Sequence, residues 1–361
     1  DDLKLVGAAG LTVAGDIDID GTTNLDVVDV DGAVNFAADV TFADGADIIT
    51  ASAGTSNFRA GVNAGNSIES GGNYNVVVGD EAGTAITTGD NNVAVGYQAL
   101  DANTTGYSNT ALGVAALGTN VSGLGNTAVG ANALDISTAN YGTAVGDNAL
   151  GANTSAGNGT AVGANALSAN TTGASNTAVG KNALTANTTG AQNTAMGLEA
   201  GKSITTGTYN DFFGFRAGDL TTTASNNVGI GSNTLGANTT GASNTAVGSN
   251  ALVANTTGAS NVAVGAGAAG ANTTGASNTA VGQAALTANT TASNNVAVGQ
   301  AALGANTTGT SNAAVGQGAL DANTTGSSNT AVGVNALGVN TTAANNSAFG
   351  ATSLDANTTG T

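Results

Sequence analysis

The stretch N-T-A-V-G-S-N-A-L-V-A-N-T-T-G-A-S, residues 244–260, is a well-formed copy of a unit that repeats along most of the chain. In each copy a glycine follows an apolar residue, here Val247, which we name the key residue. Key residues return every 17 residues, with a single 16-residue step between Val129 and Val145. The series is Val78, Val95, Leu112, Val129, Val145, Val162, Val179, Met196, Phe213, Ile230, Val247, Val264, Val281, Val298, Val315, Val332 and Phe349. A fixed period of this length is typical of a solenoid, in which copies of one coil stack on each other.

Each unit is predicted to contain two short β segments and a turn. In T-A-V-G the key residue is expected to face inward, with the preceding alanine on the opposite face. The segment N-A-L is expected to add a second inward contact through its leucine, and A-N-T-T-G has the composition of a turn. The sequence therefore predicts an all-β chain, a parallel β-solenoid or β-roll with a 17-residue repeat. The core is predicted to include Val78, Val95, Val129, Val179, Val247, Val281, Leu252 and Leu286.

An asparagine stands three residues before the key residue in 15 of the 17 units, as at Asn75, Asn176 and Asn278. Identical residues at one height of each coil are expected to stack into a ladder of side-chain amides. With about 4.8 Å between paired strands, the 17 units predict a rod about 80 Å long.

The alanine before the key residue suggests that several copies of the chain assemble. On the predicted strand orientation, Ala94, Ala178, Ala246 and Ala280 would form a small apolar face exposed to water. Three chains around one axis would cover that face, so we predict a parallel homotrimer.

Composition excludes several classes of function. The 361 residues include 56 glycines and no proline, cysteine, histidine or tryptophan, and the net charge is −18. Five basic residues do not provide the positive surface that nucleic acids or anionic membranes require. No apolar run is long enough for a membrane span.

Without histidine or cysteine the usual catalytic sets are missing, and Asp80 with Glu81 is the one adjacent carboxylate pair in the repeat region. We expect neither an enzyme nor a cofactor.

The N-terminal part differs in composition. Residues 1–50 hold 11 of the 23 acidic residues, and Asp-Gly pairs separate short alternating runs. This pattern predicts short β-strands, wound in a trimer into a narrow intertwined stem. Residues 51–72 are predicted to be a transition, and residues 73–361 a solenoid of 17 coils.

One weak metal candidate lies in that stem. Asp16, Asp18 and Asp20 match the opening of a calcium-binding loop, but Val27 stands where the loop requires glutamate. A strand with its acidic face in water is the favoured interpretation, so no metal is predicted.

The stretch from Met196 to Ile230 is the least regular part of the repeat. Glu199 and Arg216 are 17 residues apart, as are Lys202 and Asp219, so each pair is predicted to form an ion pair between adjacent coils. The densest aromatic cluster lies here, and it is either a receptor- or glycan-binding belt or a lock on the coil register. The register lock is the favoured interpretation. The aromatic residues are Tyr209, Phe212, Phe213 and Phe215.

The turns also contain N-x-T glycosylation sequons, which matter only where a glycosylation pathway exists. We expect plain turn residues. The sequons include Asn103, Asn170, Asn187, Asn238, Asn255 and Asn272.

The unit T-A-V-G-x-N-A-L resembles the S-V-A-I-G-x-x-A coils of trimeric autotransporter adhesin heads. It is even more similar to the N-T-A-V-G-x-x-A-L repeats of bacteriophage tail fibres. Val247 to Leu252 and Val281 to Leu286 carry the match, which covers about residues 73–361. The acidic segment from Gly15 to Asp47 is also similar to the stems of phage fibres. The resemblance implies a homotrimeric left-handed β-roll used for attachment, although the unit here is longer than that of the adhesin heads.

These features predict a structural attachment fibre, a phage tail fibre or similar virion appendage, that acts as a stiff extracellular spacer. The expected partners are two further copies of the chain, other virion or fibre proteins at its ends, and a host-surface receptor or glycan. One alternative is the head of a bacterial surface adhesin that binds matrix or glycan. Another is a monomeric solenoid that binds ice or glycan, although the Thr-Thr pairs fall beside glycine in predicted turns.

Overall fold

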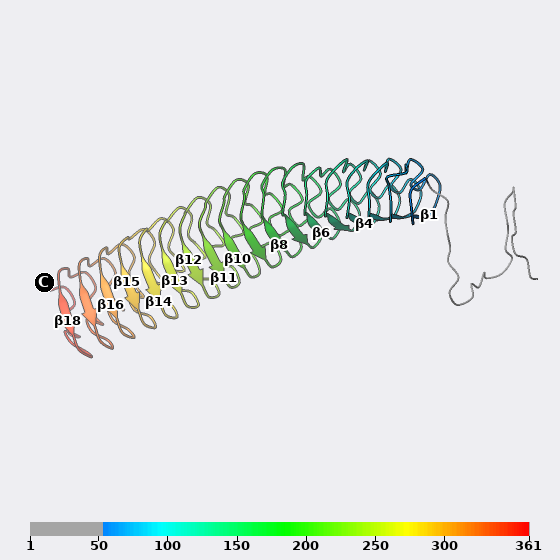
Figure 1. Ribbon diagram of the computed structural model, residues 1–361. Coiled ribbons are helices and arrows are strands. Elements are labelled where there is room, and N and C mark those ends of the chain that lie inside the picture. Colours follow the sequence, from blue (N-terminus) through cyan, green and yellow to red (C-terminus); the bar gives the residue numbers. More distant parts are fainter. Residues whose placement is uncertain (1–52, 361) are drawn as a thin grey trace, which may run out of the picture. The chain divides into compact units, whose positions relative to one another are not determined.

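The computed structural model describes residues 53–360, which form one stack of coils (Figure 1). Each coil contributes one three-residue strand, and the described residues contain no helix, so none that could span a membrane. The strands are β1 (Phe58–Ala60), β2 (Val76–Val78), β3 (Val93–Val95), β4 (Thr110–Leu112), β5 (Thr127–Val129), β6 (Thr143–Val145), β7 (Thr160–Val162), β8 (Thr177–Val179), β9 (Thr194–Met196), β10 (Asp211–Phe213), β11 (Val228–Ile230), β12 (Thr245–Val247), β13 (Val262–Val264), β14 (Thr279–Val281), β15 (Val296–Val298), β16 (Ala313–Val315), β17 (Thr330–Val332) and β18 (Ser347–Phe349).

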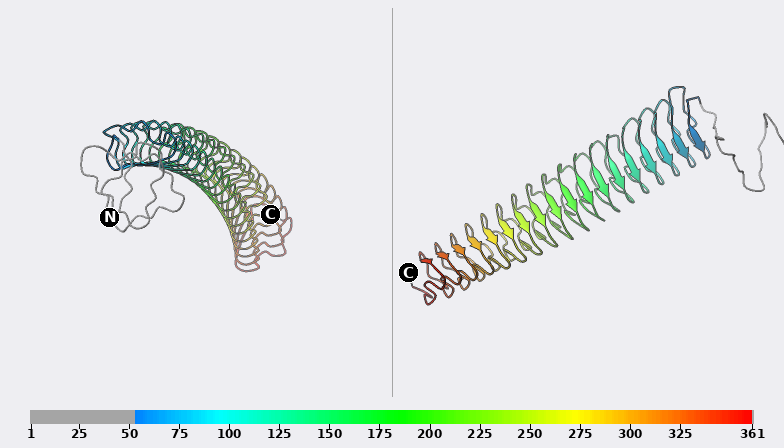
Figure 2. Two further views of the ribbon diagram at one scale, coloured as in Figure 1. Left: turned by 90° about the vertical axis from the view of Figure 1, so that its right-hand side faces the viewer. Right: turned by 60° about the horizontal axis from the view of Figure 1, so that its bottom comes forward.

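The strands form one parallel sheet along one side of the stack (Figure 2). Each strand pairs in register with the same strand of the next coil, so that Thr245 lies beside Val262 and Val247 beside Val264. The predicted parallel β-solenoid with a 17-residue repeat is confirmed. The predicted N-terminal stem, with its candidate calcium residues Asp16, Asp18 and Asp20, lies outside the described residues.

The solenoid begins earlier in the chain than predicted. β1 lies within residues 51–72, which were predicted to be a transition, and it pairs with β2 in the same parallel register. Its key position holds Ala60, which pairs with Val78 after a step of 18 residues. The described sheet therefore has 18 strands, one more than the 17 predicted coils.

The predicted orientation of the strands is wrong. The alanine before the key residue is fully buried, and the key residue lies on the outer face, as Ala246 and Val247 illustrate. The predicted core residues Val78, Val95, Val129, Val179, Val247 and Val281 are all partly exposed. Ala94, Ala178, Ala246 and Ala280 are fully buried within their own chain. A partner chain is therefore not needed to cover the alanines.

The narrow interior of the coil explains this orientation. We name the fifth residue after the key residue the interior leucine; Leu252 and Leu286 are examples, and both are fully buried, as predicted. A larger inward strand residue occurs where this position is glycine. Val77 points inward in β2, and a Cβ on Gly83 would lie 2.8 Å from its Cγ1. No described coil holds a large residue at both positions, because close-packed interiors leave no room for both.

The glycine after the key residue lets adjacent coils approach closely. Gly248 has a φ of +122°, and a Cβ there would lie 2.7 Å from the carbonyl carbon of Gly265 in the next coil. Neither the dihedral angle nor the spacing accepts a side chain, which explains why glycine recurs at this place.

Two ladders of buried asparagines run through the stack. In the predicted ladder, the strand-side asparagine Asn244 accepts a hydrogen bond at Oδ1 from the backbone N–H of Asn261 at 2.9 Å. Its Nδ2 donates to the carbonyl oxygen of Gly258 at 2.8 Å. The second ladder was not predicted and consists of the turn asparagines, the eighth residues after the key residues. In it, Asn255 Nδ2 donates to Asn238 Oδ1 at 2.9 Å. Both ladders satisfy buried polar groups by linking one coil to the next.

Candidate functional site: the outer strand face and the charged coils

The outer face of the sheet is a continuous, almost uncharged surface. The first and third residues of each strand point outward, as Thr245 and Val247 do in β12. They are mostly threonine and valine, and many are substantially exposed, from 36% at Val145 to 70% at Phe349. Among the outward residues of the 18 described strands, only Asp211 is charged. Contiguous apolar columns of this length on a protein surface indicate an interaction site.

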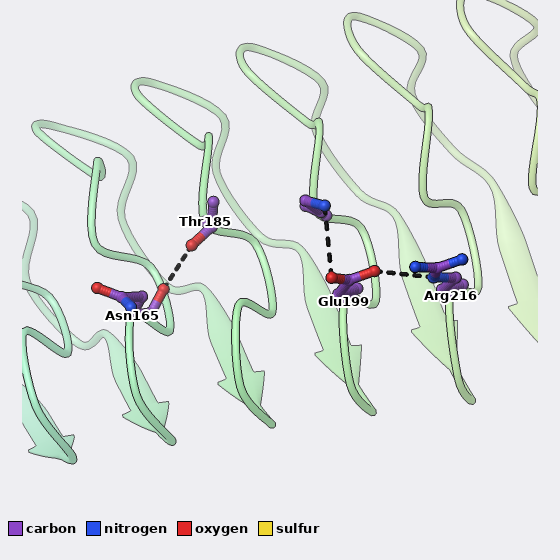
Figure 3. A network of polar contacts seen from close by, with 5 residues as sticks. Asn165, Thr185, Glu199 and Arg216 are labelled. Carbon is purple, nitrogen blue, oxygen red and sulfur yellow. Dashed lines mark hydrogen bonds and ion pairs between the residues drawn. The ribbon is translucent and has the colours of Figure 1, made fainter.

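A charged group lies on a neighbouring side of the stack, in the coils that contain β9 and β10. Arg216 Nε lies 2.8 Å from Glu199 Oε2 of the preceding coil, which confirms the predicted pair (Figure 3). This hydrogen bond is the largest influence that holds the pKa of Glu199 below its usual range. The guanidinium of Arg216 also lies over the Phe215 ring, 5.1 Å from the ring centroid, within the range of a cation–π contact.

The second predicted ion pair is wrong. Lys202 Nζ lies 3.4 Å from Glu199 Oε1 in its own coil, and no ion pair joins it to Asp219 among the described residues. Two basic side chains therefore share the single carboxylate of Glu199. Burial raises the pKa of Asp219, and the nearby charge of Lys202 only partly opposes this effect. A spacing of one coil places the two residues in one column, but Glu199, three residues away, competes for the lysine.

The four aromatic residues of this region do not form one surface. Phe212 is fully buried, Phe213 faces outward on β10, Phe215 lies beyond the strand beside Arg216, and Tyr209 is exposed before the strand. Phe212 is therefore unable to contact a receptor, and the hypothesis of one aromatic belt is wrong for this residue.

Phe212 instead makes the interior of its coil unlike the others. Its ring occupies the place of the interior leucine, where this coil has Gly218, and it faces Gly229 of the next strand. The turn-asparagine ladder is also broken here, because Ile204 and Thr221 replace asparagine. At this break the buried Asn187 Oδ1 and Thr221 Oγ1 have no hydrogen-bond partner. If the coils stacked one coil out of register, the Phe212 ring would face an alanine instead of Gly229. The close match between Phe212 and Gly229 therefore favours a register lock.

The remaining candidate groups show no assembled site. Within residues 53–360 no group of three acidic, histidine or cysteine residues is arranged to hold a metal. Of the adjacent carboxylates Asp80 and Glu81, Glu81 accepts a hydrogen bond from Gln98 Nε2 at 2.7 Å. The asparagines of the sequons, Asn103, Asn170, Asn187, Asn238, Asn255 and Asn272, are all buried in the turn-asparagine ladder.

Sequence reasoning missed the outer strand face as a site because it assigned the two sides of the strand in reverse. The absence of charge from alternate strand positions was visible in the sequence and could have indicated it. No family model matches this chain, and no curated protein matches it.

Proposed function

We propose that this chain is the shaft of a homotrimeric attachment fibre, a phage tail fibre or a similar virion appendage. It acts as a stiff extracellular spacer that holds a receptor-binding element away from the particle. The observation that carries this proposal is the outer strand face, which extends over all 18 described strands with one charged residue, Asp211.

The stack has the mechanical properties that a spacer needs. At about 4.8 Å per paired strand, 18 coils span about 80 Å. Bending such a stack would strain the sheet hydrogen bonds and both asparagine ladders together. The strand pairing, as between Thr245 and Val262, also fixes the register of each coil against the next.

The outer strand face gives the trimer its interface. In a parallel trimer, three copies of this face meet around one axis, and each residue meets its own counterparts at the same height. Burial of the outward valines, together with Phe213 and Phe349, contributes about 25 cal/mol for each Å² of apolar surface removed from water. This interface replaces the alanine face that the sequence suggested.

The partners follow from this arrangement. Two further copies of the chain bind the outer strand face, and other virion or fibre proteins bind at the ends. A host-surface receptor or glycan is the final target of attachment. The bacterial adhesin head would use the same assembly on a cell surface instead of on a virion.

Light scattering on the purified full chain tests the assembly. The expected mass is three times the 33.8 kDa of one chain. The double variant Val247→Lys/Val281→Lys, which places charges on the outer strand face, is expected to lower the mass to that of one chain. Val253→Lys changes a valine outside the strand and is the control that keeps the trimer. A wild-type mass of one chain would contradict the proposal.

A second candidate function uses the same face in a monomer. The outward strand residues form in-register columns of threonine and valine, as Thr245 beside Val262 and Val247 beside Val264 illustrate. Such an array fits ordered water, so a monomeric chain is expected to show thermal hysteresis. Hysteresis that Thr245→Lys reduces would favour ice binding over the fibre shaft.

A further inference from the structure

The shortened coil between Val129 and Val145 differs from all the others. Its missing residue falls in the turn, where other coils have two threonines, such as Thr256 and Thr257, and this coil has Thr138 alone. The strand side of the coil keeps its usual bond, because Asn126 Nδ2 donates to the carbonyl oxygen of Ala139 at 2.9 Å. The omission is therefore confined to the outer corner of the coil.

This omission leaves an open hollow on the surface, of about 440 Å³. That volume lies within the range of sites for small organic ligands. The hollow is lined by Thr138, Ala139, Asn140, Tyr141, Ser155, Gly157 and Asn158, from the short coil and the coil after it.

The exposed aromatic ring of Tyr141 forms one wall of the hollow and is held in a fixed position. Tyr141 is 60% exposed, and its backbone N–H donates to the carbonyl oxygen of Leu124 at 3.0 Å. Its ring lies over Gly125, where a Cβ would come within 2.8 Å of the ring Cδ1. Other coils have serine at the position of Gly125, such as Ser243 and Ser260. The glycine therefore makes room for the ring.

The other walls offer polar groups that are free to bind a ligand. Asn140 Oδ1 accepts a hydrogen bond from the backbone N–H of Leu124 at 2.9 Å, which fixes the side chain. Within the described part of the chain, its Nδ2 has no protein partner, and the same holds for the Tyr141 and Ser155 hydroxyls and the side-chain amide of Asn158. No charged side chain lines the hollow.

We propose that this hollow binds one residue of a neutral saccharide. The apolar C–H face of a sugar ring packs against an aromatic ring, and the sugar hydroxyls exchange hydrogen bonds with amide and hydroxyl groups. The absence of lysine, arginine and carboxylate from the lining disfavours phosphate, other anions and metal ions. This proposal goes beyond the spacer role and does not depend on trimer formation, since the lining comes from two adjacent coils of one chain.

Saturation-transfer NMR on the full chain tests the proposal with millimolar glucose, galactose, mannose and N-acetylglucosamine as probes. At least one of these sugars is expected to bind weakly. Tyr141→Ala is expected to weaken its binding about tenfold or more, a loss of about 1.4 kcal/mol. Insertion of one threonine between Thr138 and Ala139 restores the regular coil, fills the hollow and is expected to abolish binding.

Two controls separate binding from folding. Tyr74→Ala removes another tyrosine that is 60% exposed but does not line the hollow, and this variant is expected to bind as the wild type does. The insertion variant has the regular coil geometry, so its circular dichroism is expected to match that of the wild type. The proposal is overturned if none of the four sugars binds the wild type. It is also overturned if Tyr141→Ala and the insertion variant bind as tightly as the wild type.

Discussion

Phe212 faces Gly229 of the next coil so closely that a Cβ on Gly229 would lie 2.9 Å from Cδ1 of the ring. The ring also fills the space beside Gly218, whose counterpart in a regular coil is an interior leucine such as Leu252. This coil therefore exchanges the usual alanine and leucine for phenylalanine and glycine.

The exchange predicts a compensating pair of substitutions. Phe212→Ala leaves a cavity and is expected to lower the free energy of unfolding by about 3–5 kcal/mol. Phe212→Ala/Gly218→Leu recreates the pair formed by Ala246 and Leu252, and Gly218 already has a φ of +64°, near the +50° of Leu252. Most of the loss is expected to return, as measured by urea unfolding followed by circular dichroism. A double variant no more stable than Phe212→Ala would refute this account of the interior.

The turn-asparagine ladder predicts a large cost for a small side-chain truncation. Asn255→Ala removes the donor to Asn238 Oδ1 and the acceptor for Asn272 Nδ2, at 2.9 and 2.8 Å. Each buried group left without a partner costs about 1–3 kcal/mol. Thr257→Ala, two residues away on the exposed turn, is the matched control and is expected to be near neutral. Equal urea midpoints for the two variants would mean that the ladder does not stabilise the stack.

Acidification is expected to increase the contribution of three aspartates to stability. Burial raises the pKa of Asp101, Asp135 and Asp321 above the ordinary value of 3.8. Because the folded chain favours their protonated forms, this contribution is fully present below about pH 3.8 and is lost as the pH rises through the raised values. The triple Asp→Asn variant is expected to show a flatter dependence of the thermal midpoint on pH between neutral pH and pH 4. If the slope of the thermal midpoint against pH is unchanged in the variant, these three carboxyl groups do not cause the pH dependence.

Asp211 tests the proposed trimer interface at a single position. In a parallel trimer three Asp211 carboxylates meet at one height on the outer strand face, where like charges repel each other. Asp211→Thr introduces the residue that β12 has at the same place, Thr245, and is expected to raise the thermal midpoint of the trimer. Asp147→Thr, outside the strand face, serves as the comparison. If the two substitutions have the same effect on the midpoint, Asp211 does not lie in an interface.

The repeat predicted the coils and their parallel register, because stacking aligns identical residues whatever their orientation. It did not predict which side of the strand faces inward. Alternation alone does not distinguish Ala246 from Val247 as the inward residue, and the choice depends on the space that Leu252 occupies across the coil. β1 was missed because Ala60 stands at its key position and the step to Val78 is 18 residues.

At the charged coils the sequence predicted one of the two ion pairs of Glu199 and missed the other. The spacing identified Glu199 with Arg216, since both lie in one column of the stack. The same spacing gave the wrong partner for Lys202, because a flexible lysine reaches a carboxylate within its own coil. Burial of Phe212 depends on the glycines at 218 and 229, which a search for aromatic clusters does not consider.

Burial of the turn asparagines limits how this chain can be produced. Asn255 Nδ2, the atom to which a glycan would be attached, already donates hydrogen bonds to Asn238 Oδ1 and to the carbonyl oxygen of Gly258 inside the stack. In a compartment that glycosylates nascent chains, sugar transfer and coil closure would compete for the same nitrogen. A modified asparagine would block the stacking of the following coil. An expression host without this machinery therefore allows the whole rod to close, whereas a glycosylating secretory host would yield chains interrupted at the first modified turn.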